Sequence, residues 1–197
     1  MTIENLPESV NILLNLSRIP EETFGYMRLS SFEKTSGTEN GVSTMAELLA
    51  GKISKPIVLL YGTPGLGKTH LALALAWERL LMRKTVTYWQ VSMLLDSLRE
   101  GYRIEERLRP GEQSLETYTS IMMYAKGCHT LILDDMGTQK DTEFAADRLN
   151  LIVDHRYIHR KETVITSNTL NIPDRILDRC KDGKIVMLTG TSYRGKK

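Results

Sequence analysis

The stretch PIVLLYGTPGLGKTHLALALA, residues 56–76, decides the fold of this chain. A strand-like apolar run meets a glycine-rich turn, and four residues complete the pattern G-x-x-x-x-G-K-[ST]: Gly62, Gly67, Lys68 and Thr69. Glycines permit backbone angles that turn successive N–H groups inward around an anion, and the following helix adds its dipole. We therefore predict a phosphate-binding loop made of Gly62, Thr63, Pro64, Gly65, Leu66, Gly67, Lys68, Thr69 and His70. Lys68 is expected at the β- and γ-phosphates, and the Thr69 hydroxyl at Mg²⁺.

Composition limits the remaining choices. A chain of 197 residues with 41% hydrophobic content is long enough for one α/β domain with a core. A net charge of +2 does not by itself indicate nucleic-acid binding, so any DNA contact must come from a local patch. Cys128 and Cys180 fit no metal-ligand spacing, and we find neither a signal-peptide pattern nor a membrane-spanning run. We expect a cytoplasmic protein with no membrane partner.

Strand and helix patterns alternate after residue 43, which predicts an α/β fold: a three-layer αβα sandwich on a five-stranded parallel sheet. The expected strands are 57–61, 85–91, 130–135, 163–168 and 184–190. The expected helices are 45–50 (capped by Thr44), 68–82, 92–102 (capped by Ser92), 114–125 (capped by Ser114), 143–160 and 173–180. Residues 103–113 are expected to form a surface connection. Residues 1–43 are expected to be an N-terminal segment ending in a flexible connector, 35–43, and residues 44–197 the nucleotide-binding domain.

Two carboxylates end the predicted strand in LILDDMG, residues 131–137. Asp134 is expected to hold Mg²⁺, because hard cations take oxygen ligands. Asp135 is expected to face the attacking water as general base. The alternative is that both acids lie in solvent or cap the next helix. The phosphate loop upstream favours the catalytic interpretation.

Two further polar residues, Asn168 and Arg179, lie at the ends of a predicted strand and a predicted helix. If strand 163–168 lies between strands 57–61 and 130–135, Asn168 projects toward the γ-phosphate and can orient water. Alternatively, Asn168 begins a turn. Arg179 lies at the end of a short predicted helix, where its guanidinium could reach a neighbouring subunit and stabilise charge on a transferring phosphoryl group. As a lone arginine it would instead be a surface charge at a helix C-terminus.

Five segments together resemble one family: GTPGLGKTHLA, LILDDMG, HRYIHRKETVITSN, ILDRC and GTSYR. They are similar to the AAA+ ATPases of the bacterial helicase-loader group, the DnaC/DnaI proteins, and to the related transposition helper IstB. The resemblance spans about residues 18–195 and includes the Ile-Pro entry segment RIPEETFGYMRLSSFE. It implies Mg²⁺-dependent hydrolysis of ATP on an AAA+ core without a large helical lid. It also implies roles for Asn168 (sensor 1), Arg179 (arginine finger) and Arg194 (sensor 2-like arginine). Asp135 replaces the glutamate of most AAA+ proteins, as is usual in this group.

The resemblance also implies partners. The first expectation is a replicative helicase loader, and the alternative is an IstB-like helper of a transposase. Both imply contact with single-stranded DNA and head-to-tail assembly of several copies, with weak ATPase activity as a monomer. The residues after the second strand could contact DNA, although acids alternate with bases there, as on a solvated helix face. The charged and aromatic residues of this segment are Arg99, Glu100, Tyr102, Arg103, Glu105, Glu106, Arg107 and Arg109.

Two other classes stay open from the motifs alone. A small-molecule P-loop kinase also uses a phosphate loop and acids, but the sequence has no convincing arginine-rich lid segment. A nucleotide-gated binding module without turnover would need Lys68 and Asp134. It need not keep Asn168, Arg179 or Arg194.

Overall fold

A computed structural model describes residues 5–138 and 142–193 of the chain. Its centre is a five-stranded sheet in the order β2-β3-β4-β1-β5, in which every neighbouring pair is parallel. The strands are β1 Ile57–Tyr61, β2 Val86–Gln90, β3 Thr130–Met136, β4 Glu162–Ser167 and β5 Lys184–Met187. This order confirms the predicted parallel sheet, and it places β4 between β1 and β3, the arrangement on which the proposed role of Asn168 depends.

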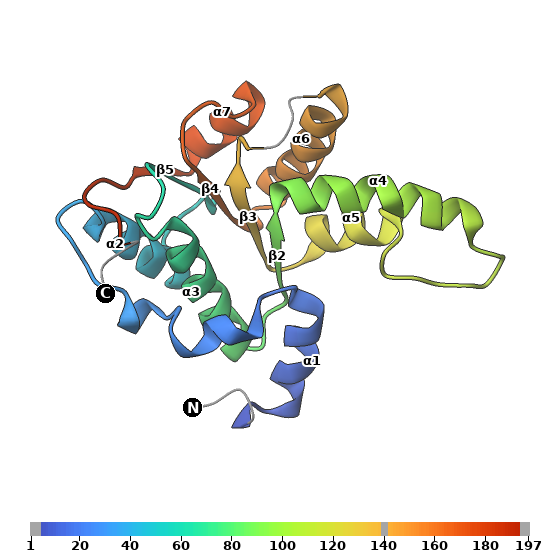
Figure 1. The fold of residues 1–197 in the computed structure, drawn as a ribbon, viewed down its shortest axis with the longest axis horizontal. Helices are drawn as coiled ribbons and strands as arrows, with labels where there is room; N and C mark the ends of the chain where they lie inside the picture. The colour runs from blue at the N-terminus through green and yellow to red at the C-terminus, as the bar shows by residue number, and fades with distance from the viewer. Residues whose placement is uncertain (1–4, 139–141, 194–197) are drawn as a thin grey trace.

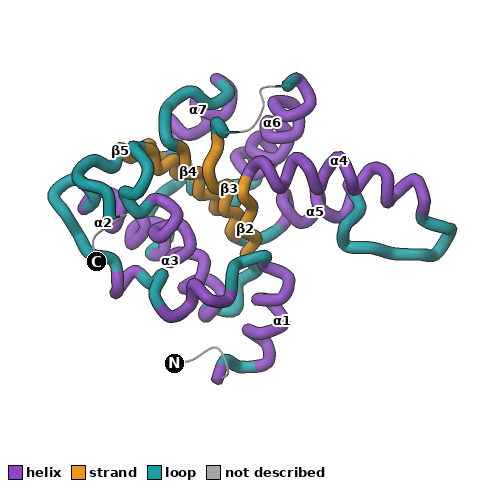
Figure 2. Tube along the Cα trace, in the orientation of Figure 1, coloured by secondary structure: helices purple, strands orange, loops and turns teal. Residues whose placement is uncertain are grey.

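Helices cover both faces of the sheet, which makes the predicted three layers (Figures 1 and 2). On one face lie α1 Glu8–Ser17, α2 Glu39–Leu49 and α3 Lys68–Leu81. On the other lie α4 Val91–Arg107, α5 Tyr118–Gly127, α6 Glu143–Ile158 and α7 Asp174–Asp182. Because side chains alternate along a strand, Val58 and Leu60 pack on the first face and Ile57 and Leu59 on the second. All four are fully buried.

The predicted connector over residues 35–43 is wrong for residues 39–43, because α2 already begins at Glu39. Thr44 is buried within the helix and does not cap it. Gly41 explains the error: a Cβ there would lie 2.7 Å from Leu188 and 2.8 Å from Leu71. Glycine is thus used for close packing of α2 and does not mark a loop.

The connection between β2 and β3 also differs from the prediction. Helix α4 starts at Val91 without a Ser92 cap and continues through Arg107, so residues 103–107 are helical. Helix α5 begins at Tyr118 and is capped by Thr117, whose side chain accepts a hydrogen bond from the Ser120 N–H. Gly101 permits α5 to approach closely, since a Cβ there would lie 2.6 Å from the Tyr118 nitrogen. Strand β5 ends at Met187, three residues before its predicted end.

The N-terminal segment packs against the rest of the chain, through a helix, α1, that the sequence did not predict. Val10 and Leu14 of α1 are buried in the same core as α3. Two short 3-10 helices, Glu21–Gly25 and Leu29–Ser31, continue along α3. There, Phe24 lies edge-on to Trp77 with ring centres 4.8 Å apart, and the Trp77 indole donates a 2.9 Å hydrogen bond to Thr23. Within the described residues, no helix is both long and apolar enough to cross a membrane.

Candidate functional site

A cavity of about 850 Å³ lies at the carboxyl ends of β1, β3 and β4. Parallel α/β sheets bind ligands at this edge because the loops there leave the strands in different directions. The phosphate loop, the acids after β3 and the residues after β4 all meet at this cavity. Its lining includes Tyr26, Met27, Phe32, Glu33, Pro64, Gly65, Gly67, Lys68, Thr69, His70, Gln90, Asp134, Asp135, Thr166, Asn168 and Tyr193.

The loop after β1 has a backbone that only glycine accommodates at two positions. Gly62 has φ 145°, and a Cβ there would lie 2.2 Å from the Leu188 carbonyl oxygen. Gly67 has φ 81°, and a Cβ there would lie 2.5 Å from the Phe32 ring. Helix α3 then begins at Lys68, so the loop leads directly into a helix N-terminus. This is the geometry that binds phosphate groups. The Leu66 side chain is buried in the core and leaves only its backbone to the loop.

Lys68 is buried and reaches back across this loop. Its Nζ donates hydrogen bonds to the carbonyl oxygens of Gly62 at 2.7 Å and Thr63 at 3.0 Å. It also donates to Asn168 Oδ1 at 2.9 Å. Lys68 and Asn168, each expected near the γ-phosphate, are thus in contact, and this contact requires β4 to lie beside β1.

Asp134 is buried at the end of β3 and accepts hydrogen bonds from three hydroxyl groups. Thr69 donates to its Oδ1 at 2.9 Å, Thr166 to the same oxygen at 2.6 Å, and Tyr88 to its Oδ2 at 2.9 Å. Burial, assisted by Asp134, raises the pKa of Tyr88 far above its usual range, so the phenol stays a donor. Thr69 and Asp134 therefore present two adjacent oxygens to the cavity.

Asp135 has an unusual backbone conformation. Its φ of 58° is rare for a residue with a side chain, and the register between β3 and β4 shifts between Leu133 and Met136. The Asp135 N–H donates to Thr166 Oγ1 at 2.9 Å, and its carboxylate accepts a 3.2 Å hydrogen bond from the Asn168 amide. Thr166 thus positions both acids, and the bulge lets Asp135 and Asn168 meet. Such strained residues often occur in functional sites.

The N-terminal segment supplies part of the cavity wall, which no sequence pattern predicted: Tyr26, Met27, Ser31, Phe32 and Glu33. The Phe32 ring lies edge-on to His70 at 5.1 Å and to Tyr193 at 5.8 Å. His70 Nε2 hydrogen-bonds the Arg28 carbonyl oxygen at 3.1 Å, and the Tyr193 hydroxyl donates to the Glu33 carbonyl at 2.6 Å. An aromatic wall beside a phosphate loop suits a nucleotide base.

Two further residues of the site, Thr166 and Tyr88, were not predicted from the sequence. Thr166 lies in the polar end of TVITSN and could have been included with Asn168. The role of Tyr88 depends on the pairing of Tyr88 with Ile132, which puts it on the same face as Asp134. No local pattern reveals that register.

Arg179 is placed away from these residues and does not line the cavity. Its Nε donates a 3.0 Å hydrogen bond to Asp154 Oδ1, and its guanidinium lies 4.7 Å from the centre of the Tyr157 ring. The hydrogen bond to Asp154 raises the pKa of Arg179. Arg175 pairs with the other Asp154 oxygen at 2.6 Å. Arg194 lies outside the described residues.

Two of the four arginines in the segment proposed from sequence to contact DNA pair with acids of the same helix. Arg99 pairs with Asp96 at 2.8 Å, and Arg103 pairs with Glu100 at 3.0 Å. Tyr102 stacks on Tyr118 with ring centres 4.0 Å apart. These contacts reduce both the free positive charge and the free aromatic surface of α4.

Comparison with solved structures identifies the fold. The crystal structure of the DnaC helicase loader superposes with a TM-score of 0.68 at 17% identity, covering 86% of this chain and 100% of that one. The crystal structure of DnaI superposes with a TM-score of 0.64 at 21% identity, covering 90% of this chain and 95% of DnaI. The structure of AMPPCP-bound DnaA from Aquifex aeolicus superposes with a TM-score of 0.66 at 21% identity, covering 82% of this chain and 50% of that one. The chain has the AAA+ core that these proteins share.

Curated proteins of similar sequence include a helicase loader and a putative ATP-binding protein of an insertion sequence. The replicative helicase loader DnaC of Escherichia coli (strain K12) is 27% identical over 143 residues, covering 68% of this chain and 55% of that protein. The chain thus spans about half the length of that loader. A putative ATP-binding protein of an insertion sequence from Geobacillus stearothermophilus is 26% identical over 206 aligned residues, covering 98% and 76%. The profile of the family described as IstB-like ATP binding protein matches residues 9–197. The chain belongs to this IstB-like ATP-binding family, which is related to the DnaC and DnaI loaders.

Proposed function

We propose that this protein hydrolyses ATP at the described cavity and uses the cycle to assemble a protein partner on DNA. One observation carries the proposal. Lys68, Asn168 and Asp135 form a continuous chain of hydrogen bonds beside the Thr69–Asp134 pair. A phosphate anchor, a polar amide and a carboxylate thus meet at one point, as hydrolysis at a γ-phosphate requires.

The residues present fit ATP with Mg²⁺. Thr69 Oγ1 and Asp134 Oδ1 are 2.9 Å apart. Neighbouring oxygens around an octahedral Mg²⁺ with bonds of about 2.0–2.1 Å lie at about that separation. Thr69 and Asp134 would hold Mg²⁺, and the glycine loop would hold the phosphates. When bound, Mg²⁺-ATP supplies the phosphoryl group and the cation that balances its charge.

The remaining polar groups have separate roles in the proposal. Lys68 would redirect its donors from the loop carbonyls to phosphate oxygens, which offer charge-assisted hydrogen bonds. Asp135 would accept a proton from water, and the Asn168 amide would orient that water. A module that only bound nucleotide would gain nothing from the Asp135–Asn168 contact. That contact therefore supports turnover over simple binding.

The position of Arg179 supports a site completed between subunits. It lies on α7, which packs against β1 and the edge strand β5, and it is absent from the cavity lining. A neighbour packed head-to-tail would bring its Arg179 to this cavity, after exchanging Asp154 for the nucleotide. ATPase activity should then rise steeply with protein concentration. Activity strictly proportional to protein concentration, from a protein that stays monomeric, would contradict assembly.

For the partner, we favour a transposase, so that the protein would be a transposition helper. The family match over residues 9–197 and the insertion-sequence relative covering 98% of the chain support this choice. A replicative helicase is the second candidate, supported by the similarity to DnaC. The test is a pull-down from cells of the source organism with an Asp135→Asn variant that retains ATP. Recovery of a transposase supports the first choice, and recovery of the replicative helicase supports the second.

A further inference from the structure

The five parallel strands all begin along one edge of the sheet, opposite the nucleotide cavity. The register aligns Val86 with Thr130, Thr130 with Glu162, and Ile57 with Thr163, so the five entering connections lie side by side. Each connection, or the helix turn or strand residue directly beside it, carries lysine or arginine. We call these residues the basic edge: Lys52, Lys55, Arg83, Lys84, Lys126, Arg160, Lys161, Lys181 and Lys184.

Much of this charge is not neutralised by acids. Among the described residues, seven members of the basic edge have no carboxylate within ion-pair distance: Lys52, Lys55, Arg83, Lys84, Lys126, Arg160 and Lys161. Lys184 pairs with Glu47, and Lys181 lies 3.9 Å from Asp178. A chain of net charge +2 therefore concentrates positive charge on one face.

Two of these arginines occupy strained backbone positions. Arg83 has φ 58° and Arg160 has φ 48°, each two residues after the end of its helix, where glycine is usually preferred. Arg18, which has a similar φ of 59°, pairs with Glu116 and lies 4.1 Å from the Trp89 ring. Arg83 and Arg160 are exposed and have no such ion pair among the described residues. Within the described part of the chain, no ion pair or ring contact of these two side chains offsets the strain.

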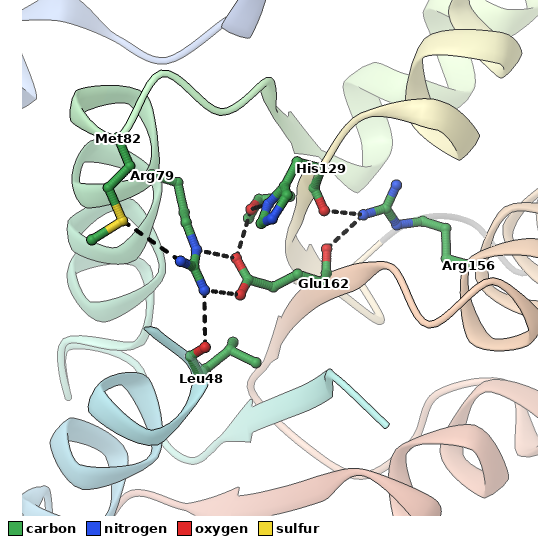
Figure 3. Close-up of polar contacts among 7 residues, drawn as sticks. Leu48, Arg79, Met82, His129, Arg156 and Glu162 are labelled. Atoms are coloured by element: carbon green, nitrogen blue, oxygen red, sulfur yellow. Dashed lines mark hydrogen bonds and ion pairs between the residues drawn. The ribbon is translucent and has the colours of Figure 1, made fainter. Parts of the chain in front are cut away.

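Buried guanidinium groups fix the connections that carry the basic edge (Figure 3). Arg79 makes a bidentate ion pair with Glu162, at 3.0 and 2.6 Å, and also donates to the Leu48 carbonyl. Arg156 is fully buried and donates to backbone oxygens that include those of Ala125, Cys128, His129 and Glu162. No carboxylate pairs with Arg156 among the described residues, so its charge adds to that of the edge.

We propose that the basic edge binds the phosphate backbones of duplex DNA. The choice of DNA as the polyanion rests on the proposed function. Five strands about 4.8 Å apart make an edge about 19 Å wide, wider than one nucleic-acid backbone and broad enough to span a major groove of about 12 Å. Single-strand binding instead relies on free aromatic faces. The Tyr157 ring at this edge is not free to stack on a base, because the Lys55 ammonium lies 4.2 Å and the Arg179 guanidinium 4.7 Å from its centre.

The test measures fluorescence anisotropy of a labelled duplex of random sequence, without nucleotide, over a range of salt concentrations. The edge variant carries Lys52→Gln, Arg83→Gly, Lys84→Gln and Arg160→Gly. We expect it to bind duplex DNA on the order of tenfold more weakly or worse, with a salt slope reduced by roughly 0.9 for each phosphate that the protein no longer neutralises. A matched variant removes four charges from the α4 region: Arg99→Gln, Arg103→Gln, Arg107→Gln and Arg109→Gln. It should keep the wild-type slope on duplex DNA.

A second pair of variants separates binding from a purely structural role at helix C-termini. Arg83→Gly with Arg160→Gly should not lower the thermal midpoint, because glycine suits their backbone conformation, yet it should weaken DNA binding. Arg83→Lys with Arg160→Lys should retain binding, since the attraction to phosphate depends mainly on charge.

The proposal would be overturned if the edge variant bound duplex DNA with the affinity of the wild type and with the same dependence on salt concentration. So would binding of the wild type to vesicles of phosphatidylcholine and phosphatidylserine but not to DNA. Titration of the same proteins with ATP distinguishes a failure of the DNA-binding proposal from a failure of the proposed ATPase function. The edge variant should bind ATP as the wild type does. A wild type that bound DNA through this edge but not ATP would refute only the ATPase.

Discussion

The hydroxyl of Tyr88 donates a 2.9 Å hydrogen bond to Asp134, the carboxylate that also contacts the phosphate-loop residue Thr69. Tyr88 lies in the edge strand β2, and helix α4 begins immediately after that strand, at Val91. The contact thus joins the edge of the sheet to the proposed metal ligand. Partners of this kind orient a ligand and set its affinity for the metal.

Replacing Tyr88 with phenylalanine should raise the Mg²⁺ concentration needed for ATP hydrolysis by roughly 10–100-fold. The ring is retained, so the fold should persist, while Asp134 loses one of three hydroxyl donors. Nucleotide affinity in excess chelator should not change. Tyr102→Phe is the matched control, because Tyr102 stacks on Tyr118 away from the site. An unchanged Mg²⁺ requirement in Tyr88→Phe would show that the hydroxyl does not position Asp134.

The two neighbouring acids should differ in what they lose on neutralisation. Asp135→Asn should bind Mg²⁺-ATP but hydrolyse it about 10²–10⁴-fold more slowly, since a positioned base is removed. Asp134→Asn should instead weaken the Mg²⁺-dependent part of nucleotide binding, because a cation ligand is removed. Binding titrations with and without Mg²⁺, alongside single-turnover hydrolysis, measure both effects. If the two variants gave the same Mg²⁺ dependence, this division of roles would be wrong.

Arg179→Ala should bind ATP normally and fail to hydrolyse it, since Arg179 lies outside the cavity of its own subunit. Mixing Arg179→Ala with Lys68→Ala should restore part of the activity, because one interface then pairs an intact loop with an intact arginine. The measurement is ATPase activity across mixing ratios under conditions where the wild type assembles. Arg175→Ala is the matched control, since Arg175 shares the Asp154 partner. Absence of any recovery would argue against an arginine acting between subunits.

His129 should make the fold less stable in mild acid. Burial lowers its pKa, and Arg79, Lys84 and Arg156 lower it further, although Glu162 opposes them. The unfolded chain, with an ordinary pKa of about 6.5, therefore takes up the proton first. The free energy of unfolding is then highest above about pH 6.5 and decreases as the pH falls through the folded-state pKa.

Thermal midpoints measured from about pH 7 to about pH 5 check this sign, with His129→Gln expected to flatten part of the decline. A variant that declined in parallel with the wild type would assign the pH dependence to other groups.

Local patterns were enough to predict the strands and the phosphate loop, because apolar runs and glycine spacing are properties of short segments. The start of α2 was mispredicted, since Gly41 and Asn40 resemble a loop until Leu71 and Leu188 are placed against the helix. Its helical structure depends on packing that no neighbouring residue reveals.

The site likewise contains residues that local motifs predict and residues that depend on contacts between distant segments. Lys68, Thr69, Asp134 and Asn168 follow from motifs at the ends of three strands, and they meet because those strands are adjacent. Tyr88 follows only from the register between β2 and β3. The aromatic wall around Phe32 depends on how residues 26–33 fold across α3. These contacts join distant segments, so periodicity and propensity do not predict them.

The most direct test of the account is a titration of folded wild type, Lys68→Ala and Lys84→Ala with a fluorescent ATP analogue and Mg²⁺. Lys68 is buried in the phosphate loop, whereas Lys84 lies exposed at the opposite edge of the sheet. We predict that Lys84→Ala binds as the wild type does. Lys68→Ala should bind roughly 10–100-fold more weakly, or not measurably, because it loses charge-assisted hydrogen bonds to phosphate. Wild-type affinity in a folded Lys68→Ala protein would contradict the assignment of this cavity as the ATP site.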